Sequence, residues 1–333
     1  VNPAHMKAVP GRKTDVKDAE WIAELLQHGL LQPSYIPSKD QRELRELVQY
    51  RKSLVGERTR ELNRLQKMLE GANIKLSGTV TNINGKSARK ILEYILSGNE
   101  IDEKKYDEMY EEKLIAHNLK ASKEQILDDL KGFMSPLQRR MLKELLQHLD
   151  ELNVHIENLN DEIDNFMKPE EKQASQVIQD VTGIGNTSAQ TIVAVIGTDM
   201  ERFPSDRHIS SWAGLCPGDN VSAKKRKSGK IRKGNALLKS TLVLCAHAAV
   251  RHKSSYFHAQ FKRISTHRGK KRAYVAVAHS ILIAIYHILK DGVKYQDLGA
   301  EYYNQFNAER KIHAYLKKLK ALGWEPPKEA VPA

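Results

Sequence analysis

The feature that most constrains the fold of this 333-residue chain is a regular series of apolar side chains between residues 142 and 166. The series alternates spacings of three and four: Leu142, Leu145, Leu149, Leu152, Ile156, Leu159, Ile163 and Phe166. A sustained heptad of this kind predicts a long coiled-coil helix that buries one face against another helix. Two partners fit: the leucine-bearing helix predicted at 39–70, whose heptads are broken by Arg51 and Arg58, or a second subunit. The sequence leaves both open.

The remaining chain predicts a mainly α protein in three parts. Residues 1–36 read as a short strand, a Pro10-Gly11 turn and one helix that stops at Gly29. Residues 37–168 are a helical and coiled-coil region, which ends where Pro169 breaks the long helix. Residues 169–333 form a mostly helical C-terminal domain.

Composition narrows the class of partner. The formal net charge is +13 with 40% hydrophobic residues, which indicates a globular protein that binds nucleic acid or another anionic surface. The two cysteines form no CxxC pair, so we do not expect a zinc site or a disulfide framework, and a reducing cytoplasm fits. The apolar run from Ala273 to Leu289 is short for a membrane span and contains histidines, so we expect a buried helix and no membrane partner.

The densest positive charge follows the segment Trp212-Ala213-Gly214-Leu215-Cys216-Pro217. The basic run comprises Lys224, Lys225, Arg226, Lys227, Lys230, Arg232 and Lys233. It almost lacks aromatic residues, so contact with phosphates is expected rather than stacking on bases. A solvated loop is the alternative that composition leaves open.

Ser222 lies immediately before this basic run and is a candidate nucleophile. It has no adjacent His–Asp pair, most lone serines are structural, and Ser228 competes with it locally. Asp15 and Asp18 are separated by three residues, which places both carboxylates on one helical face. Such a pair could hold Mg²⁺, or could simply cap the helix N-terminus.

The turn Thr182-Gly183-Ile184-Gly185 precedes an apolar helix. Gly183 and Gly185 permit a tight turn that presents backbone amides at a helix N-terminus, a geometry that suits a phosphate. The pattern is similar to a helix-hairpin-helix motif, although Thr182 replaces its frequent proline. A plain turn between two helices remains the alternative.

Taken in order along the chain, these motifs resemble one known family. They are Val1-Asn2-Pro3, Gly11-Arg12-Lys13-Thr14-Asp15 with Asp18-Ala19, the Gly183 turn, the segment from Trp212 to Gly218 with Ser222, and Lys233-Gly234-Asn235. The combination resembles the DEDD transposases of insertion-sequence family 110, the bridge-RNA-guided recombinases. The resemblance covers essentially the whole chain, although Lys224 stands where the family commonly has glycine.

The resemblance implies an RNase H-like (RuvC-like) N-terminal domain with four metal-binding acids, a coiled coil, and a C-terminal transposase domain with a catalytic serine. Asp15 and Asp18 match the last two acids, and Ser222 matches the serine. The implied activity is DNA cleavage and strand transfer through that serine. The reaction would act on the DNA of the element and of the target. It would use Mg²⁺, a guide RNA and further subunits joined through the coiled coil.

The first Asp and the Glu of the acidic quartet would precede Val1. We therefore expect a chain that is truncated or begins at a start codon translated literally, and that is inactive in this form if the acids are truly missing. Two other hypotheses stay open. One is a non-catalytic nucleic-acid-binding protein derived from a decayed transposase. The other is a coiled-coil interaction module whose positive charge binds RNA.

Overall fold

The computed structural model describes residues 15–31, 36–99, 101–115, 121–217, 221–222, 225–226, 230–303 and 308–324. It divides into two units, residues 1–43 and 44–333, and each is described by itself. Helices make up nearly all of the regular structure in the described residues, which confirms the prediction of a mainly α protein. The strand and the Pro10-Gly11 turn predicted at the N-terminus lie outside the described residues.

The first unit contains helix α2, Asp15–Gln27. The helix ends two residues before Gly29, which has a φ of +65°, a left-handed conformation that glycine adopts without steric cost. The predicted end of this helix is therefore correct.

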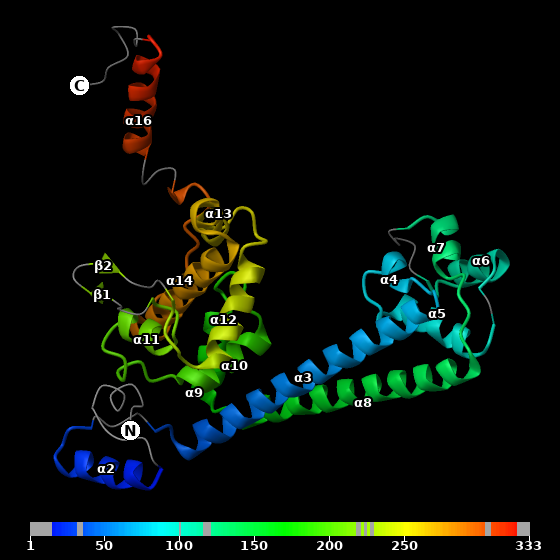
Figure 1. The fold of residues 1–333 in the computed structure, drawn as a ribbon, viewed down its shortest axis with the longest axis horizontal. Coiled ribbons are helices and arrows are strands. Elements are labelled where there is room, and N and C mark those ends of the chain that lie inside the picture. The colour runs from blue at the N-terminus through cyan, green and yellow to red at the C-terminus, as the bar shows by residue number, and fades with distance from the viewer. Residues whose placement is uncertain are drawn as a thin grey trace. The chain divides into compact units, whose positions relative to one another are not determined.

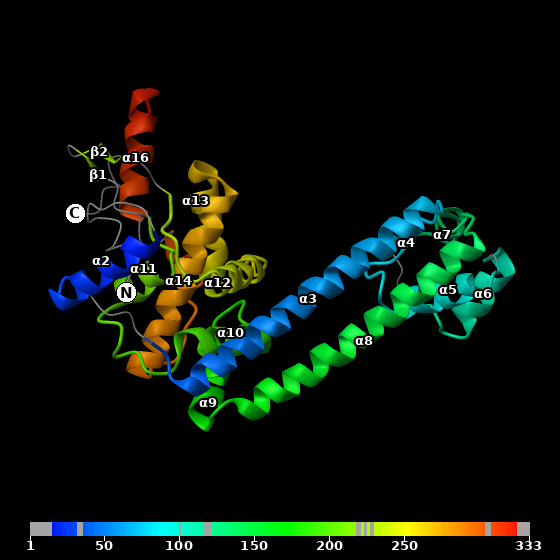
Figure 2. The same ribbon diagram turned by 60° about the horizontal axis from the view of Figure 1, so that its bottom comes forward.

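Two long antiparallel helices form the base of what we call the arm, residues 44–166. They are α3, Lys39–Gly71, and α8, Pro136–Phe166, and they lie side by side in Figures 1 and 2. The seam of α8 is buried against its own chain: Leu152, Ile156, Leu159 and Ile163 cluster with Leu44, Val48 and Leu54, while Leu142, Leu146 and Leu149 cluster with Leu65 and Leu69. The seam's partner is thus the 39–70 helix.

Polar side chains fix the register of the two helices. Arg51 Nη1 donates to Asn160 Oδ1 at 3.0 Å, Arg58 Nη1 donates to Asn153 Oδ1 at 3.3 Å, and His148 Nδ1 lies 3.5 Å from Glu61 Oε1. The pairs run in opposite directions along the two helices, as an antiparallel pairing requires. The heptad pattern slips at both ends, because Leu146 replaces Leu145 in the core and Phe166 is 38% exposed.

Four shorter helices connect α3 to α8 and close the tip of the arm. They are α4, Leu76–Thr79; α5, Lys86–Leu96; α6, Glu103–Glu111; and α7, Lys123–Asp129. Their apolar faces share a second core with the far ends of α3 and α8. The capping box of Ser135 and Gln138 starts α8, with Pro136 in its first turn.

The C-terminal helices surround α14, Lys270–Asp291, which packs on four of the others. The set also contains α9, Pro169–Ile178; α10, Asn186–Ile196; α11, Asp206–Trp212; α12, Ala236–Ala249; α13, Tyr256–Arg268; and, further along, α16, Ala308–Ala321. Among the described residues, α14 alone is long and apolar enough to cross a membrane. Its buried face, with Val277, Ile281 and Ile285, is part of the core, as expected for a central helix.

Candidate nucleic-acid interface

The segment that carries the serine and the basic run leaves the C-terminal domain as an antiparallel ribbon. We call residues 215–233 the excursion. The Leu215 amide donates to the Ser210 carbonyl and the Arg232 amide donates to the Cys216 carbonyl, both at 3.1 Å. Pro217 and Ile231 then form an antiparallel bridge. The two ends of the excursion are therefore held together where it leaves the helices.

Two glycines make this neck, which we define as residues 213–217 and 231–234. A Cβ on Gly234 would lie 2.4 Å from the carbonyl carbon of Ala213 and 2.5 Å from the Gly214 nitrogen. Gly214 has a φ of +71°, and a Cβ there would lie 2.7 Å from the Arg232 carbonyl oxygen. The two backbones therefore touch directly, and no side chain larger than hydrogen fits between them. This contact gives a physical reason for Gly214 and Gly234.

Farther out, the excursion forms a short hairpin of β1, Val221–Ser222, and β2, Lys225–Arg226. Val221 pairs with Arg226, and Ser222 pairs with Lys225. Ser222 is thus directly opposite a basic residue, in the last residue pair of the hairpin. Lys224 and Lys227 of the basic run, and the competing Ser228, lie outside the described residues.

The described base of the excursion carries exposed positive charge. Lys230, Arg232 and Lys233 are all exposed, and Arg232 Nη1 lies 3.4 Å from Ser211 Oγ as a hydrogen-bond donor. Burial raises the pKa of the neighbouring Cys216 thiol, so this cysteine is not an activated nucleophile. The local chemistry is that of a cationic surface beside a hydroxyl-bearing ribbon.

The predicted hairpin between two helices is present as α9, a turn, and α10, which pack on each other. Its two glycines have different surroundings. Gly183 has a φ of +95°, and a Cβ on it would lie 2.5 Å from the Cys245 carbonyl oxygen, so it allows close packing on α12. Gly185 is exposed with open space around it and directly precedes α10, whose N-terminus has no side-chain cap. An uncapped exposed N-terminus is the half of this motif that suits a phosphate.

A carboxylate that the sequence analysis missed ties this turn to the segment after α14. Asp297 accepts hydrogen bonds from Thr182 Oγ1 at 3.2 Å, from the Tyr256 and Gly299 amides at 2.8 Å, and from the Tyr295 hydroxyl at 3.2 Å. Partial burial opposes ionisation, but these four donors together lower the pKa of Asp297. Burial raises the pKa of Tyr295 to about 12, so its hydroxyl remains a donor at neutral pH.

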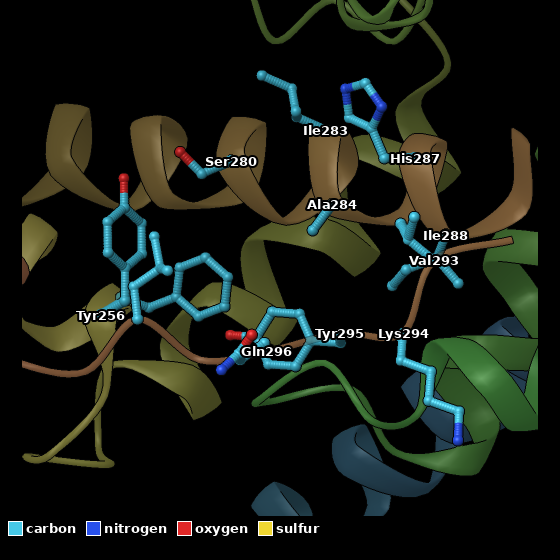
Figure 3. A pocket seen from close by; sticks show the side chains of 12 residues that line it. Tyr256, Ser280, Ile283, Ala284, His287, Ile288, Val293, Lys294, Tyr295 and Gln296 are labelled. Atoms are coloured by element: carbon cyan, nitrogen blue, oxygen red, sulfur yellow. The ribbon is translucent and has the colours of Figure 1, made fainter. Parts of the chain in front are cut away.

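The same segment covers a small cavity between α13 and α14 (Figure 3). The cavity has a volume of 360 Å³, and its walls are mostly apolar: Phe257, Ile283, Ala284, Ile288 and Val293. Such a lining does not suit a phosphodiester backbone. We therefore assign this cavity to the packing of the C-terminal segment rather than to nucleic-acid contact.

Arg51, which the sequence presents only as a break in the heptads, is the polar centre where the arm meets α10. It is 2% exposed, and its guanidinium donates to Gln190 Oε1 at 2.6 Å, to the Thr187 carbonyl at 3.0 Å and to Thr191 Oγ1 at 3.2 Å. Burial lowers its pKa to about 10, so the group remains charged at neutral pH. Arg45 Nε also donates to the Ala194 carbonyl, at 3.0 Å. The helix after the Gly185 turn is thus fastened to the arm.

A second basic cluster lies at the junction of α13 and α14. His267 and Arg268 end α13, and Lys270, Lys271 and Arg272 begin α14 without an acidic residue in its first turn. Cations are unfavourable at a helix N-terminus, so an anion bound there would relieve the local repulsion. The sequence signal for this cluster is the run His267-Arg268-Gly269-Lys270-Lys271-Arg272, which is shorter than the basic run at 224–233.

Asp15 and Asp18 stand one helical turn apart at the start of α2, which agrees with their predicted spacing. They belong to the first unit, whereas Ser222 belongs to the second. Across the described ranges, no group of three or more His, Cys, Asp or Glu side chains gathers as a metal site would require. Any cation held by this pair needs further ligands.

Comparison with known proteins assigns the class. Residues 1–74 match a family model described as "Transposase", the DEDD type of IS110, and residues 175–262 match the "Transposase IS116/IS110/IS902 family". The first match covers α2 and α3, and the second runs from α9 through the excursion to α13. Both parts are thus those of a transposase, a class of DNA recombinase enzyme that binds DNA and, in its DEDD form, uses a divalent metal.

Two curated proteins are similar to this chain. The transposase for insertion sequence element IS1111A of Coxiella burnetii is 24% identical over 284 residues, which cover 84% of this chain and 67% of that protein. The insertion element IS110 uncharacterized 43.6 kDa protein of Streptomyces coelicolor is 27% identical over 135 residues, or 38% of this chain and 31% of that protein. The two family models and the two relatives together support an IS110-family transposase.

Proposed function

We propose that this chain cuts and rejoins DNA through the hydroxyl of Ser222. The observation that carries the proposal is the position of Ser222 on β1, opposite Lys225, in an excursion that Gly214 and Gly234 hold at its base. An anchored ribbon can present one hydroxyl at a constant place, which a nucleophile requires. Family membership supports the same assignment.

In the proposed step, Ser222 Oγ bonds to the phosphorus of a DNA phosphodiester while the bond from phosphorus to the leaving deoxyribose oxygen breaks. The serine proton passes to solvent, and the leaving oxygen takes up a proton. The product is a phosphoserine diester, which conserves the energy of the broken bond. A hydroxyl from the new strand then displaces the serine, so that rejoining needs no ATP.

Positive charge on the same segment supports binding of the DNA backbone. The proposed contacts are Lys224, Lys225, Arg226, Lys227, Lys230, Arg232 and Lys233, with the turn of Gly183 and Gly185, in which Gly183 packs on α12 and Gly185 offers the exposed backbone. Lysine and arginine placed around an attacking hydroxyl also stabilise charge that develops on the phosphate. These residues contact phosphates and therefore carry little sequence information.

We propose Mg²⁺ as the divalent metal, with Asp15 and Asp18 among its ligands. Carboxylate oxygens are the donors that Mg²⁺ prefers, but two carboxylates are fewer than such a site uses. When bound, the metal would neutralise phosphate charge and favour ionisation of an attacking hydroxyl.

We also propose that the chain has three functional parts, residues 1–36, 37–168 and 169–333. The protein would act in the cytoplasm without a membrane partner. It would work with a guide RNA and as an assembly of several subunits. RNA guidance would leave sequence recognition to base pairing, which fits an interface built for phosphates. The seam of α8 is filled by α3 of the same chain, so subunit contact through the arm would use its outer faces.

The test compares Ser222→Ala with Ser228→Ala in strand transfer and in DNA binding. We expect Ser222→Ala to lose strand transfer while its DNA affinity stays within about twofold, because a hydroxyl contributes little beside several charges. Ser228→Ala should keep both. Strand transfer by Ser222→Ala at the wild-type rate would exclude the proposed nucleophile.

The alternative is a non-catalytic nucleic-acid-binding protein, which the two basic segments favour by themselves. Under that hypothesis the wild-type protein shows no strand transfer, and Ser222→Ala changes nothing. Under both hypotheses, replacing Lys230, Arg232 and Lys233 with Gln should flatten the log–log salt dependence by about 0.9 for each lost phosphate contact on duplex DNA. Strand transfer, and not affinity, separates the two.

A further inference from the structure

A groove runs between the neck of the excursion and α14, and its walls differ in chemistry from the basic surface around it. It has a volume of 980 Å³. One wall is formed by Leu215, Pro217 and Ile231 of the neck, and the other by Val275 and Ala276 of α14. Both walls are apolar, whereas a paired duplex presents sugars and charged phosphates to a protein.

The rim of the groove is cationic. Lys230 stands on the neck side, and Lys271 and Arg272 stand on the α14 side, all of them exposed. Neither Lys271 nor Arg272 has a carboxylate within 4.0 Å in the described part of the chain. A ligand that complements this arrangement has an apolar flat body and flanking negative charges. A nucleotide with its base unpaired has both.

A residue that lines the groove also has an unsatisfied polar atom, buried just behind the groove surface. Gln260 Nε2 donates to Ser280 Oγ at 2.8 Å, but the buried Gln260 Oε1 has no hydrogen-bond partner in the described structure. An unsatisfied buried acceptor is costly, and a donor from a ligand would remove that cost. Nucleobases carry such donors on their pairing edges. His279, also in the lining, is held towards its neutral form because burial lowers its pKa.

We propose that this groove receives one unpaired base of the DNA strand bound along the excursion, with the Gln260 amide oxygen accepting from the base and the rim cations binding its phosphates. The inference rests on the proposed function, since strand exchange requires local separation of the strands. Insertion of the base between apolar walls would hold the strand open beside Ser222. The energetic logic is that of base flipping, in which stacking on protein replaces stacking on DNA.

The probe is a DNA duplex with a single unpaired 2-aminopurine, whose fluorescence rises when the base leaves the stack. The same duplex fully paired, and one with an abasic residue at the unpaired position, are the comparison DNAs. All binding is measured with the full chain carrying Ser222→Ala, so that no covalent step interferes. We expect fluorescence to rise on binding, and the unpaired-base duplex to bind about tenfold more tightly than either comparison DNA.

Gln260→Leu should weaken binding of the unpaired-base duplex about fivefold to tenfold and leave the paired duplex unchanged. Ala276→Leu places a larger side chain on the α14 wall and so narrows the groove. This variant should suppress the fluorescence rise. The matched control is Gln296→Leu, an exposed glutamine outside the groove, which should behave as the parent protein. Circular dichroism confirms that each variant is folded.

Equal binding of the unpaired-base and abasic duplexes, or a full fluorescence rise in both groove variants, would overturn the inference. The proposed function fails differently. If the wild-type chain transfers strands without needing Ser222 while the fluorescence rise persists, the nucleophile is wrong and the groove stands. If transfer needs Ser222 but no base enters the groove, only the groove is wrong.

Discussion

The arm and the neck both bring together distant parts of the chain, but by opposite kinds of contact. In the arm, leucine and isoleucine side chains of α8 fill the space along α3, and polar pairs such as Arg58 with Asn153 set the register. In the neck, Gly214 and Gly234 have no side chains, so the two backbone segments contact each other directly. A seam of side chains can relax around a smaller residue, whereas a backbone contact cannot accept a larger one.

The largest effect on strand transfer should follow from Gly234→Ala, because the added Cβ would overlap backbone atoms of Ala213 and Gly214. The neck must open, which displaces Ser222 and the basic run together. We expect a stability loss of about 1–3 kcal/mol. Strand transfer should fall at least about a hundredfold, the cost of a small misplacement of reacting groups. Hydrogen exchange measures the change directly, because the Arg232 amide should lose the protection of its bond to Cys216.

Leu149→Ala in the arm is the matched comparison. Leu149 is fully buried, so its truncation should cost about 2–5 kcal/mol of unfolding free energy while the neck remains closed. Protection of the Arg232 amide should therefore be wild-type under native conditions. Wild-type exchange of that amide in Gly234→Ala would show that the neck tolerates a side chain, and the contrast between the two regions would disappear.

An intermediate effect is expected for Arg51→Met, which keeps the volume of the side chain and removes its donors. Gln190, Thr191 and the Thr187 carbonyl would each lose a bond. A single buried acceptor left unsatisfied costs about 1–3 kcal/mol, so the urea-unfolding free energy should fall by at least that amount. Arg60→Met, at an exposed ion pair with Glu57, should change it by less than about 0.5 kcal/mol. Equal stability of the two variants would mean that the Arg51 hydrogen bonds do not stabilise the contact between the arm and α10.

The smallest effect should come from Asp297→Asn and should depend on pH. Because the folded-state pKa of Asp297 lies below its ordinary value of 3.8, its carboxylate stabilises the fold above that value. This contribution is lost as the pH falls through the folded-state pKa. The variant should thus melt at a lower temperature than wild type at pH 7, and the gap should close on acidification. Asp180→Asn, an exposed carboxylate near the same turn, is the control, and a gap that persists in acid would refute this account.

Most of the helical fold could be predicted from local sequence patterns. The heptad predicted α8, the leucine-bearing stretch at 39–70 predicted α3, and Pro169 and Gly29 marked real ends. Local patterns did not distinguish a partner helix in the same chain from one in a second subunit, because either would bury the leucine face of α8. They also misjudged Arg51, since the acceptors that make a buried guanidinium stable come from α8 and α10.

The candidate site was predictable in its residue types and not in its construction. The order of motifs along the chain led to Ser222 and the basic run, which lie within the family match at 175–262, and their roles stay predictions. The pairing of Ser222 with Lys225, the function of Gly183 in packing, and the groove beside α14 depend on residues far apart in sequence. No local pattern indicates Asp297, because donors to its carboxylate come from segments as far apart as Thr182, Tyr256 and Gly299.

The sequence alone therefore determined the helices, the excess of positive charge, and the order of motifs that defines the family. Periodicity, capping and charge are properties of neighbouring residues, so they can be read without knowing the fold. The tertiary structure alone decided which helix covers the seam of α8, why two glycines must stand at the neck, and where apolar walls meet cationic rims. Those features depend on contacts between distant segments, and such contacts exist only once the chain has folded.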